Sequence, residues 1–201
     1  MKKLVFIICI LISLTGCYVN HKLAVSKNVR IIDKAVIVVD STQDSKYIHY
    51  GSCDSYKADF IEELKAELKN CNLVVIDSTN KASDYTIIIS TLKFQESMST
   101  ETINDTASQD NGKVFNLNDC SVGAETTLYN QNSEKIDSWF LYDNSKESLT
   151  NNRSFWDYLF RTNKDMHNYR KKELSSNVFE NISRKCARNT SSKISKKISK
   201  Q

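Results

Sequence analysis

The chain is predicted to fold as an α/β (α+β) domain, in which a mixed β-sheet of about five strands is covered by helices. Three observations lead to this class. Residues 35–40 are a continuous apolar and β-branched run, residues 57–70 repeat apolar side chains with a helical period, and residues 72–77 form a second apolar run. This strand–helix–strand order predicts two parallel strands joined by a crossover helix.

The first two elements have different apolar patterns. The run 35–40 has no polar alternation before Asp40, which predicts a strand buried on both faces. The segment 57–70 carries charged residues around one apolar stripe, which predicts an amphipathic helix that ends near Asn70. The stripe consists of Phe60, Ile61, Leu64 and Leu68.

Three further strands are expected along the chain. Residues 84–94 carry apolar side chains at both odd and even positions, so this strand should be central in the sheet, with Ile87 and Ile89 on one face and Leu92 and Phe94 on the other. Residues 120–129 and 135–142 should pair as a hairpin around a polar turn.

Two segments complete the expected domain. Residues 95–119 are dominated by polar side chains and are predicted to be a long polar loop, either disordered or functional. Residues 171–199 are predicted to be a basic C-terminal helix packed on the sheet. Its apolar residues recur at multiples of four, which makes a tilted seam. The seam consists of Leu174, Val178, Ile182, Cys186, Ile194 and Ile198.

The N-terminus has the pattern of an export signal. Two lysines precede an apolar run over residues 4–14, which is too short for a lasting membrane span of about 20 residues. Residues 1–16 are therefore predicted to be a signal peptide that is removed. The alternative is an ordinary secretory signal with a cysteine nearby by chance.

The sequence Leu14-Thr15-Gly16-Cys17 resembles the lipobox of bacterial lipoproteins. The resemblance implies that signal peptidase recognises Leu14, Thr15 and Gly16, and that the thiol of Cys17 is acylated. Fatty acyl chains on Cys17 would hold the mature protein on a membrane.

The location of the mature protein follows from this anchor. An aspartate directly after the lipid-bearing cysteine resembles the inner-membrane retention signal of enterobacteria. This chain has Tyr18 at that position, which favours the outer membrane, with the body of the protein facing the periplasm. Residues 17–34 would be a lipidated tether, and residues 35–201 a single domain.

Four cysteines remain in the expected domain: Cys53, Cys71, Cys120 and Cys186. In an exported protein they are either disulfides, with three possible full pairings, or free buried thiols. The candidate disulfide joins Cys71 and Cys120, because each residue is expected to begin a strand running in the same direction, which places both at the same end of the sheet.

Charge is divided unevenly along the chain. Residues 161–201 hold 12 basic and 3 acidic residues, whereas residues 17–160 hold 14 basic and 21 acidic ones. The basic helix either contacts an anionic surface or only points its charges at water. The candidate contact residues are Arg184, Lys185, Arg188, Lys193, Lys196, Lys197 and Lys200.

The sequence offers no catalytic signature. It has neither the G-x-S-x-G nor the H-E-x-x-H motif, and its 3 histidines are not spaced like metal ligands. Cys53 and His49 could form a nucleophile pair, but a disulfide cysteine beside a surface imidazole is the simpler interpretation. No catalytic residue, metal or cofactor is therefore predicted.

Part of the pattern resembles a known domain. Residues 35–41 resemble the opening strand, residues 82–89 an "A-D-Y-hydrophobic" strand entry, and residues 128–139 the hairpin of one group of proteins. That group contains the curli-secretion lipoprotein, the lipoprotein activator of penicillin-binding proteins and the N-terminal domain of TolB. The resemblance covers residues 35–143 and implies an α/β domain; Glu134 stands in place of the usual hairpin glycine.

These observations predict a non-catalytic envelope lipoprotein that scaffolds or regulates an envelope assembly, such as a secretion channel or a cell-wall synthase. Its expected partners are the membrane and an envelope protein or a second copy of itself; nucleic acid is not expected. The alternatives are a lipid-anchored enzyme or stress factor, and a surface-exposed exclusion or adhesion lipoprotein. The aromatic-rich segment 155–160 would either dock a partner or cover the core.

Overall fold

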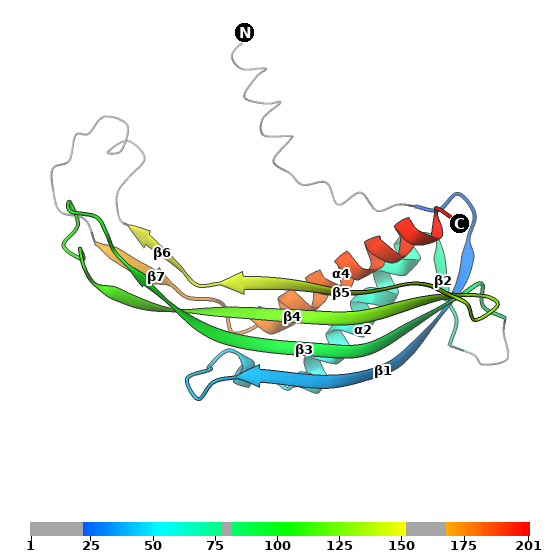
Figure 1. Cartoon of the computed structure of the whole chain (residues 1–201), viewed down its shortest axis with the longest axis horizontal. Coiled ribbons are helices and arrows are strands. Elements are labelled where there is room, and N and C mark those ends of the chain that lie inside the picture. Colours follow the sequence, from blue (N-terminus) through cyan, green and yellow to red (C-terminus); the bar gives the residue numbers. More distant parts are fainter. Residues whose placement is uncertain (1–21, 78–81, 152–167) are drawn as a thin grey trace, which may run out of the picture.

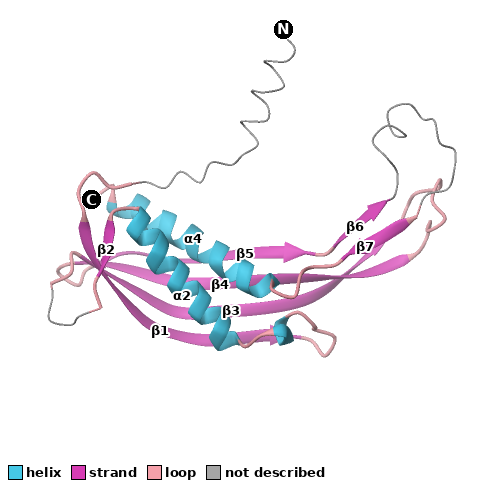
Figure 2. Ribbon diagram, turned by 180° about the vertical axis from the view of Figure 1, so that it is seen from behind, coloured by secondary structure: helices cyan, strands magenta, loops and turns pink. Residues whose placement is uncertain are grey.

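A curved five-stranded sheet with two helices on one face forms the body of the protein (Figures 1 and 2). The computed structural model describes residues 22–77, 82–151 and 168–201. The strand order is β2-β1-β3-β4-β5, and β1 runs parallel to both β2 and β3, while the other pairs are antiparallel. The predicted mixed sheet is therefore confirmed. The strands are β1 (Lys27–Ser41), β2 (Leu73–Val75), β3 (Tyr85–Thr102), β4 (Val114–Asn130) and β5 (Lys135–Lys146).

The crossover helix α2 (Cys53–Asn70) lies where the sequence predicted it, with four more residues at its start. Ser52 caps it, because its hydroxyl accepts a hydrogen bond from the Ser55 amide at 3.0 Å. The predicted stripe faces the core: Phe60, Leu64 and Leu68 are fully buried, and Ile61 packs against them.

The C-terminal helix α4 (Val178–Ile198) packs beside α2 on the same face of the sheet (Figure 2). Its predicted four-residue seam is confirmed from Val178 to Ile198, and Thr190 fills the step that has no apolar residue. Leu174, the first residue of the predicted seam, precedes the helix and is partly buried against the core. The small buried residues Ser183, Ala187 and Ser191 also lie on this helix. Small side chains allow two helices to approach closely, which suits a second layer made of only two helices.

This helix begins later than residue 171, where the sequence placed its start. Residues 171 and 172 belong instead to β7 (Tyr169–Lys172), which pairs with β6 (Ser148–Asn151) in a separate two-stranded sheet. A seam of apolar residues fixes the buried face of a helix but not its first turn. The N-cap residue, Asn177, makes no side-chain capping bond that would have marked the start.

The prediction of a polar loop over residues 95–119 is wrong. β3 continues to Thr102 and β4 begins at Val114, and the two strands stay in register from Gln95 opposite Ser121 to the end of the pair. This hairpin extends beyond the helices (Figure 1). Backbone hydrogen bonds hold a strand whatever its side chains are, so a hairpin with little covering layer can be polar on both faces.

The tether predicted for residues 17–34 is also too long, because β1 starts at Lys27. Val29 in this part is fully buried. The mixture of charged and apolar residues between 27 and 34 concealed the strand, since only alternate residues face the core.

The faces of β3 differ from the predicted ones. Ile87, Ile89, Leu92 and Phe94 are all fully buried and belong to one core. The pairing with β4 shifts between Ile89 and Thr91, so Ser90 is an extra residue on β3. This bulge changes the alternation, and even-numbered residues after it point the same way as odd-numbered residues before it.

One face of the sheet has no helix over it in the described part of the chain. The helices stand in front of the strands in Figure 2, so the opposite view in Figure 1 shows the uncovered face. The prediction that residues 35–40 are buried on both faces is wrong, because Val36 and Val38 are 64% and 40% exposed on this side. β3 is the central strand, as predicted. The uncovered side is called the outer face below.

Candidate functional site

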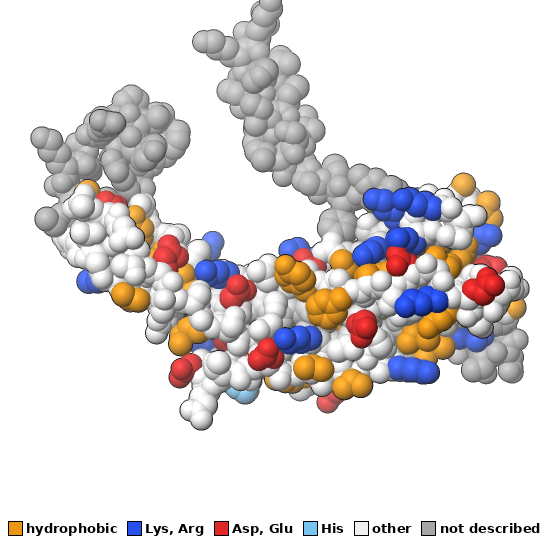
Figure 3. All heavy atoms as spheres, in the orientation of Figure 1, with side chains coloured by type: hydrophobic (Ala, Val, Ile, Leu, Met, Phe, Trp, Pro, Cys, Tyr) orange, Lys and Arg blue, Asp and Glu red, His pale blue; other side chains and the backbone are white. Residues whose placement is uncertain are grey.

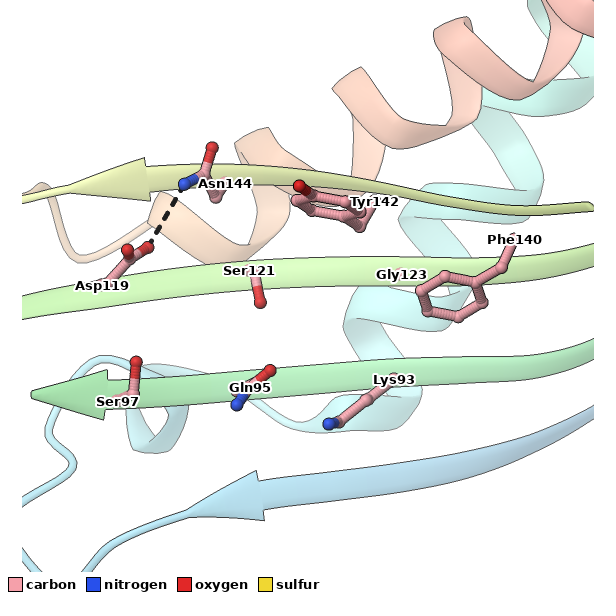
Figure 4. Close-up of a pocket in the computed structure, with 9 residues that line it drawn as sticks. All are labelled: Lys93, Gln95, Ser97, Asp119, Ser121, Gly123, Phe140, Tyr142 and Asn144. Atoms are coloured by element: carbon pink, nitrogen blue, oxygen red, sulfur yellow. Dashed lines mark hydrogen bonds between the residues drawn. The ribbon is translucent and has the colours of Figure 1, made fainter.

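A shallow groove of about 330 Å³ lies on the outer face of the sheet. β3, β4 and β5 contribute its lining, and the labelled side chains lie on the side of the sheet away from the helices (Figure 4). The lining residues are Lys93, Gln95, Ser97, Asp119, Ser121, Gly123, Phe140, Tyr142 and Asn144.

Two aromatic side chains dominate this groove. Phe140 is 50% exposed and Tyr142 is 69% exposed. The Phe140 ring lies directly against the backbone of Gly123, where a Cβ atom would come within 2.2 Å of Phe140 Cζ. Only glycine at position 123 leaves this space, so the absence of a side chain there lets the Phe140 ring lie against the sheet.

The charged groups around the groove have polar partners on neighbouring strands. Lys93 Nζ lies 3.0 Å from Asp40 Oδ2, and Asn144 donates a 3.5 Å hydrogen bond to Asp119. Beside the groove, hydrogen bonds from Thr91 and Ser90 hold the pKa of Glu125 below its usual value. These contacts give the groove polar edges beside its two aromatic side chains.

The predicted contact residues of α4 separate into two groups. In the first, Arg184 binds Asp59 of α2 at 2.9 Å, and Arg188 binds Glu63 at 2.6 Å. Lys185 lies 2.9 Å from Asp143 of β5. These three basic residues therefore join α4 to its neighbours and do not present unpaired charge to an external surface.

The second group lies at the C-terminal end of α4. A groove of about 640 Å³ is bordered by four lysines, which are the remaining predicted residues, together with Leu141, Asn189 and Ser192. This site is called the lysine groove below. Figure 3 shows basic side chains gathered at the end of the molecule where the chain terminates. The four lysines are Lys193, Lys196, Lys197 and Lys200.

A buried carboxylate joins the body to the hairpin that extends from it. Glu147 is 1% exposed and accepts hydrogen bonds from Tyr47 Oη at 2.5 Å and from the Asn118 amide at 2.7 Å. Lys171 Nζ lies 3.3 Å from it. Burial alone would raise the pKa of Glu147, but the bonds from Asn118, Tyr47 and Lys171 outweigh burial and lower it. Burial, together with the bond to Glu147, raises the pKa of Tyr47 to about 12.

A second buried carboxylate lies nearby on β3. Glu96 is 1% exposed and accepts hydrogen bonds from the backbone amides of Lys46 and Ile48, at 3.0 and 2.9 Å. It thereby holds the loop that leads to α2. Sequence reasoning missed both residues. Glu96 lies within the segment predicted to be a polar loop, and Glu147 follows the last predicted strand, so neither was expected to be buried.

The predicted Cys71–Cys120 disulfide is wrong. All four cysteines of the described residues are free thiols. Cys71 lies at the C-terminal end of α2, near the start of β3, whereas Cys120 lies opposite Glu96. The two positions are about 35 Å apart along the sheet, because β4 runs antiparallel to β3. A disulfide requires Cα atoms within about 7 Å.

The Cys53–His49 pair lacks the features of an activated nucleophile. Burial, followed by the neighbouring charge of Asp54, raises the pKa of the Cys53 thiol, which disfavours the thiolate. Burial also raises the pKa of Cys120 and of Cys186 to about 12. Within residues 22–77, 82–151 and 168–201, no group of three side chains is arranged to hold a metal ion.

Several predicted features lie outside the described residues. They are the signal segment, the recognition residues Leu14, Thr15 and Gly16, the lipid site Cys17, and the aromatic segment 155–160. Among the residues that are described, no helix is both long and apolar enough to cross a membrane.

Comparison with solved structures finds matches at low identity and with TM-scores below 0.5. A neuraminyllactose-binding hemagglutinin homologue from Helicobacter pylori matches with a TM-score of 0.48 and 12% identity, covering 90% of this chain and 89% of its own. A minor lipoprotein from Acinetobacter baumannii matches with a TM-score of 0.37 and 8% identity, covering 87% and 93%. The rare lipoprotein B from Shewanella oneidensis gives 0.34 and 10%, covering 82% and 93%.

Bacterial lipoproteins are thus among the structures to which this chain is similar. No protein-family model matches the chain. The comparison with curated proteins also gave no match.

Proposed function

We propose that this protein is a lipid-anchored component of the bacterial cell envelope that acts as a non-catalytic scaffold, and that it binds a protein partner through the outer face of its sheet. The exposure of Phe140 and Tyr142 on that face is the observation that carries the proposal. A sheet with only one face covered is expected to alternate polar residues outward. Large apolar side chains in that position indicate an interaction surface.

The aromatic groups are suited to protein recognition. Aromatic side chains are enriched in protein interfaces because they bury a large area with few rotatable bonds. Phe140 rests on Gly123, so its ring is positioned before a partner arrives. Ordering a side chain in advance reduces the entropy that binding would otherwise cost. Val36 and Val38, exposed on β1, extend the apolar character across the same face.

The membrane anchor rests on the lipobox-like sequence that ends at Cys17. Acyl chains buried in a bilayer contribute about 0.8 kcal/mol per CH₂, so acylation of Cys17 would keep the domain at the membrane surface. The outer membrane, with the body in the periplasm, is the location that Tyr18 favours.

The non-catalytic role is proposed from the composition of the outer groove. Its lining includes no histidine or cysteine, and its lysine and aspartate are both engaged by neighbouring side chains. General acid–base catalysis needs a proton donor or acceptor aimed at open space. The groove offers aromatic area and hydrogen-bonding edges instead, which suit binding.

The partner site can be tested by photo-crosslinking in intact cells. A photoreactive amino acid would replace Tyr142 on the outer face or, as the control, Asn132 in the exposed turn between β4 and β5. We expect one discrete crosslinked species from position 142 that position 132 does not give. The substitution Val38→Lys, placed on the same face, should abolish it. Identical products from both positions, or a species unaffected by Val38→Lys, would rule out the outer face as the binding site.

The anchor is tested separately by Cys17→Ser. The variant should lose acylation and leave the membrane fraction, while its outer-face crosslinks weaken because the partner is no longer held close by. If the serine variant matures normally and stays equally membrane-bound, the proposal of a lipid anchor on Cys17 is wrong. Protease treatment of intact cells would reveal a surface-exposed lipoprotein, the alternative location, by digesting the body.

A further inference from the structure

The lysine groove is the part of α4 whose charge is only partly neutralised by neighbouring side chains. Lys197 Nζ lies 2.5 Å from Asp137 of β5, and Lys193 Nζ lies 5.0 Å from the centre of the Trp139 ring. Both contacts fix their lysines at the groove wall. Lys196 and Lys200 are exposed, and neither forms an ion pair among the described residues.

A net positive charge remains after the local acids and the helix are counted. The four lysines face one carboxylate, Asp137, which leaves about three charges. The C-terminal end of a helix contributes roughly half a negative charge, which offsets a further part. More than two positive charges therefore border a groove whose wall includes the apolar side chain of Leu141. This combination suits a phosphate group attached to an apolar body.

The lysine groove lies at the end of the domain where the chain leaves toward Cys17. The Leu23 amide donates a 3.1 Å hydrogen bond to the Cys71 carbonyl, and Cys71 Sγ lies 3.9 Å from Ser191 Oγ of α4. Ser192, the next residue, lines the groove. The N-terminal start of the described chain and the C-terminal end of α4 are also close together in Figure 1.

The length of the connection limits how far this end can be from a membrane. Five residues lead from Cys17 to Lys22, and an extended chain covers at most about 3.6 Å per residue. The anchored domain is thus held within about 18 Å of the acylated cysteine at this end. With Cys17 acylated, the end of the domain that carries the lysines therefore lies within reach of the membrane surface.

We infer that the lysine groove binds the phosphate groups of anionic phospholipids in the membrane that carries the anchor. The inference deepens the proposed function and rests on its lipid anchor. Lysines near an anionic surface are attracted to it by about 1 kcal/mol each, which corresponds to about fivefold in affinity. The acyl chains set the distance from the membrane, and the groove sets the orientation.

This orientation has a consequence for the opposite end of the molecule. The hairpin of β3 and β4 extends away from the end that holds the C-terminus, along the longest axis in Figure 1. β3 has 18 residues, so its contour is about 60 Å at about 3.3 Å per residue. With the lysine groove on the membrane, the hairpin projects away from the membrane into the compartment. The outer face of the sheet is then roughly perpendicular to the membrane surface and accessible to a partner.

The test measures vesicle binding by the mature chain, residues 17–201, carrying Cys17→Ser so that no lipid contributes. Co-sedimentation is compared for vesicles of phosphatidylcholine alone and for vesicles that also contain phosphatidylglycerol. The double variant Lys196→Gln/Lys200→Gln removes two charges from the groove. The matched control, Lys34→Gln/Lys146→Gln, removes two charges from exposed positions on β1 and β5.

We expect the unmodified surface to bind only the vesicles that contain phosphatidylglycerol, and the groove variant to lose about 10- to 30-fold in affinity. The control should change by less than about threefold, and inorganic phosphate in solution should compete only weakly, because the groove acts on a lipid surface. Equal losses for both double variants would show a non-specific charge effect and overturn the inference, as would equal binding to both kinds of vesicle. Full competition by inorganic phosphate would identify a soluble ligand and also overturn it.

The vesicle result is independent of the scaffold proposal. Loss of the groove effect would leave the photo-crosslinks of Tyr142 and the fractionation of Cys17→Ser unchanged. Conversely, a natural chain that proves not to be acylated at Cys17 would remove the anchor, whatever the vesicle assay shows for the groove.

Discussion

The inner and outer faces of the sheet differ although the same strands build both. On the inner face Leu92 and Phe94 are fully buried under the helices, whereas on the outer face Phe140 and Tyr142 are at least half exposed. Successive residues of a strand point to opposite faces, so each strand contributes to both environments. The packed core therefore lies on one side of the sheet and the proposed binding surface on the other, and substitutions can separate the two.

The largest difference is expected between two phenylalanines on opposite faces. Phe94 is fully buried and packs against Tyr56 and Phe179, with ring centroids 5.8 and 6.4 Å away. Phe94→Ala should lower the free energy of unfolding by about 3–5 kcal/mol, because it leaves a cavity in the core. Phe140→Ala should lower it by no more than about 1 kcal/mol.

Urea denaturation of the two alanine variants measures this difference. The crosslinking of Tyr142 should follow the reverse order when measured under conditions in which both variants are folded. Equal destabilisation by the two substitutions would mean that the outer face belongs to the core, and the division between the faces would fail.

A smaller effect is expected at the buried carboxylate Glu147, at the end of β5. Glu147→Gln removes the charge that accepts hydrogen bonds from Tyr47 and Asn118, and should cost about 2–3 kcal/mol at neutral pH. The pKa of Glu147 is lowered in the folded state. Its stabilisation is therefore complete above the ordinary glutamate pKa and is lost as the pH falls through the lower, folded-state pKa.

Unfolding measured from neutral to acidic pH checks this sign. The difference between the unmodified protein and Glu147→Gln should shrink as the pH decreases. Glu62→Gln, an exposed position on α2, serves as the control and should change stability by less than about 0.5 kcal/mol. If Glu147→Gln lowers the free energy of unfolding by the same amount at acidic as at neutral pH, the charge of Glu147 is not what stabilises the contact between the body and the hairpin.

The smallest effect on stability is expected at Gly123. A side chain at this position must displace the Phe140 ring, because its Cβ would lie 2.2 Å from Phe140 Cζ. The ring can turn toward solvent, so Gly123→Ala should change the free energy of unfolding by less than about 1 kcal/mol. Crosslinking from Tyr142 should nevertheless decrease, because the prepositioned ring is lost.

The substitution thus separates ring position from stability. A variant that keeps full crosslinking would show that the partner does not use the position of Phe140. A variant that unfolds would show instead that the outer face contributes more to the fold than its exposure indicates.

Local patterns were sufficient where one face of an element is buried continuously. The stripe of Phe60, Leu64 and Leu68 and the four-residue seam of α4 were read correctly from spacing alone. The hairpin of β4 and β5 and the central position of β3 were also predicted. In each case the apolar side chains had no alternative partner, so periodicity determined the buried face.

The same reasoning failed where backbone pairing or a bulge decided the outcome. The hairpin over residues 95–119 is held by main-chain hydrogen bonds, which its polar side chains do not reveal. Ser90 shifts the alternation of β3, and one extra residue leaves no sign in composition. The predicted Cys71–Cys120 disulfide was wrong because the direction of β4 depends on which neighbouring strand it pairs with.

The candidate sites divide in the same way. Sequence singled out the basic residues of α4 as a group, because charge density is visible along the chain. Only the folded structure showed that Arg184 and Arg188 are neutralised by Asp59 and Glu63. Lys196 and Lys200, in contrast, form no ion pair among the described residues. The aromatic groove was not anticipated, since its residues come from three strands.

By itself, the sequence determined the buried faces of the two helices, the presence of five strands and the lipobox-like motif that ends at Cys17. These features depend on residues close together along the chain. Tertiary structure alone decided which face of the sheet stays open, which charges are cancelled and which carboxylates are buried. The physical reason is that burial and charge pairing depend on neighbours that only the folded chain brings into contact.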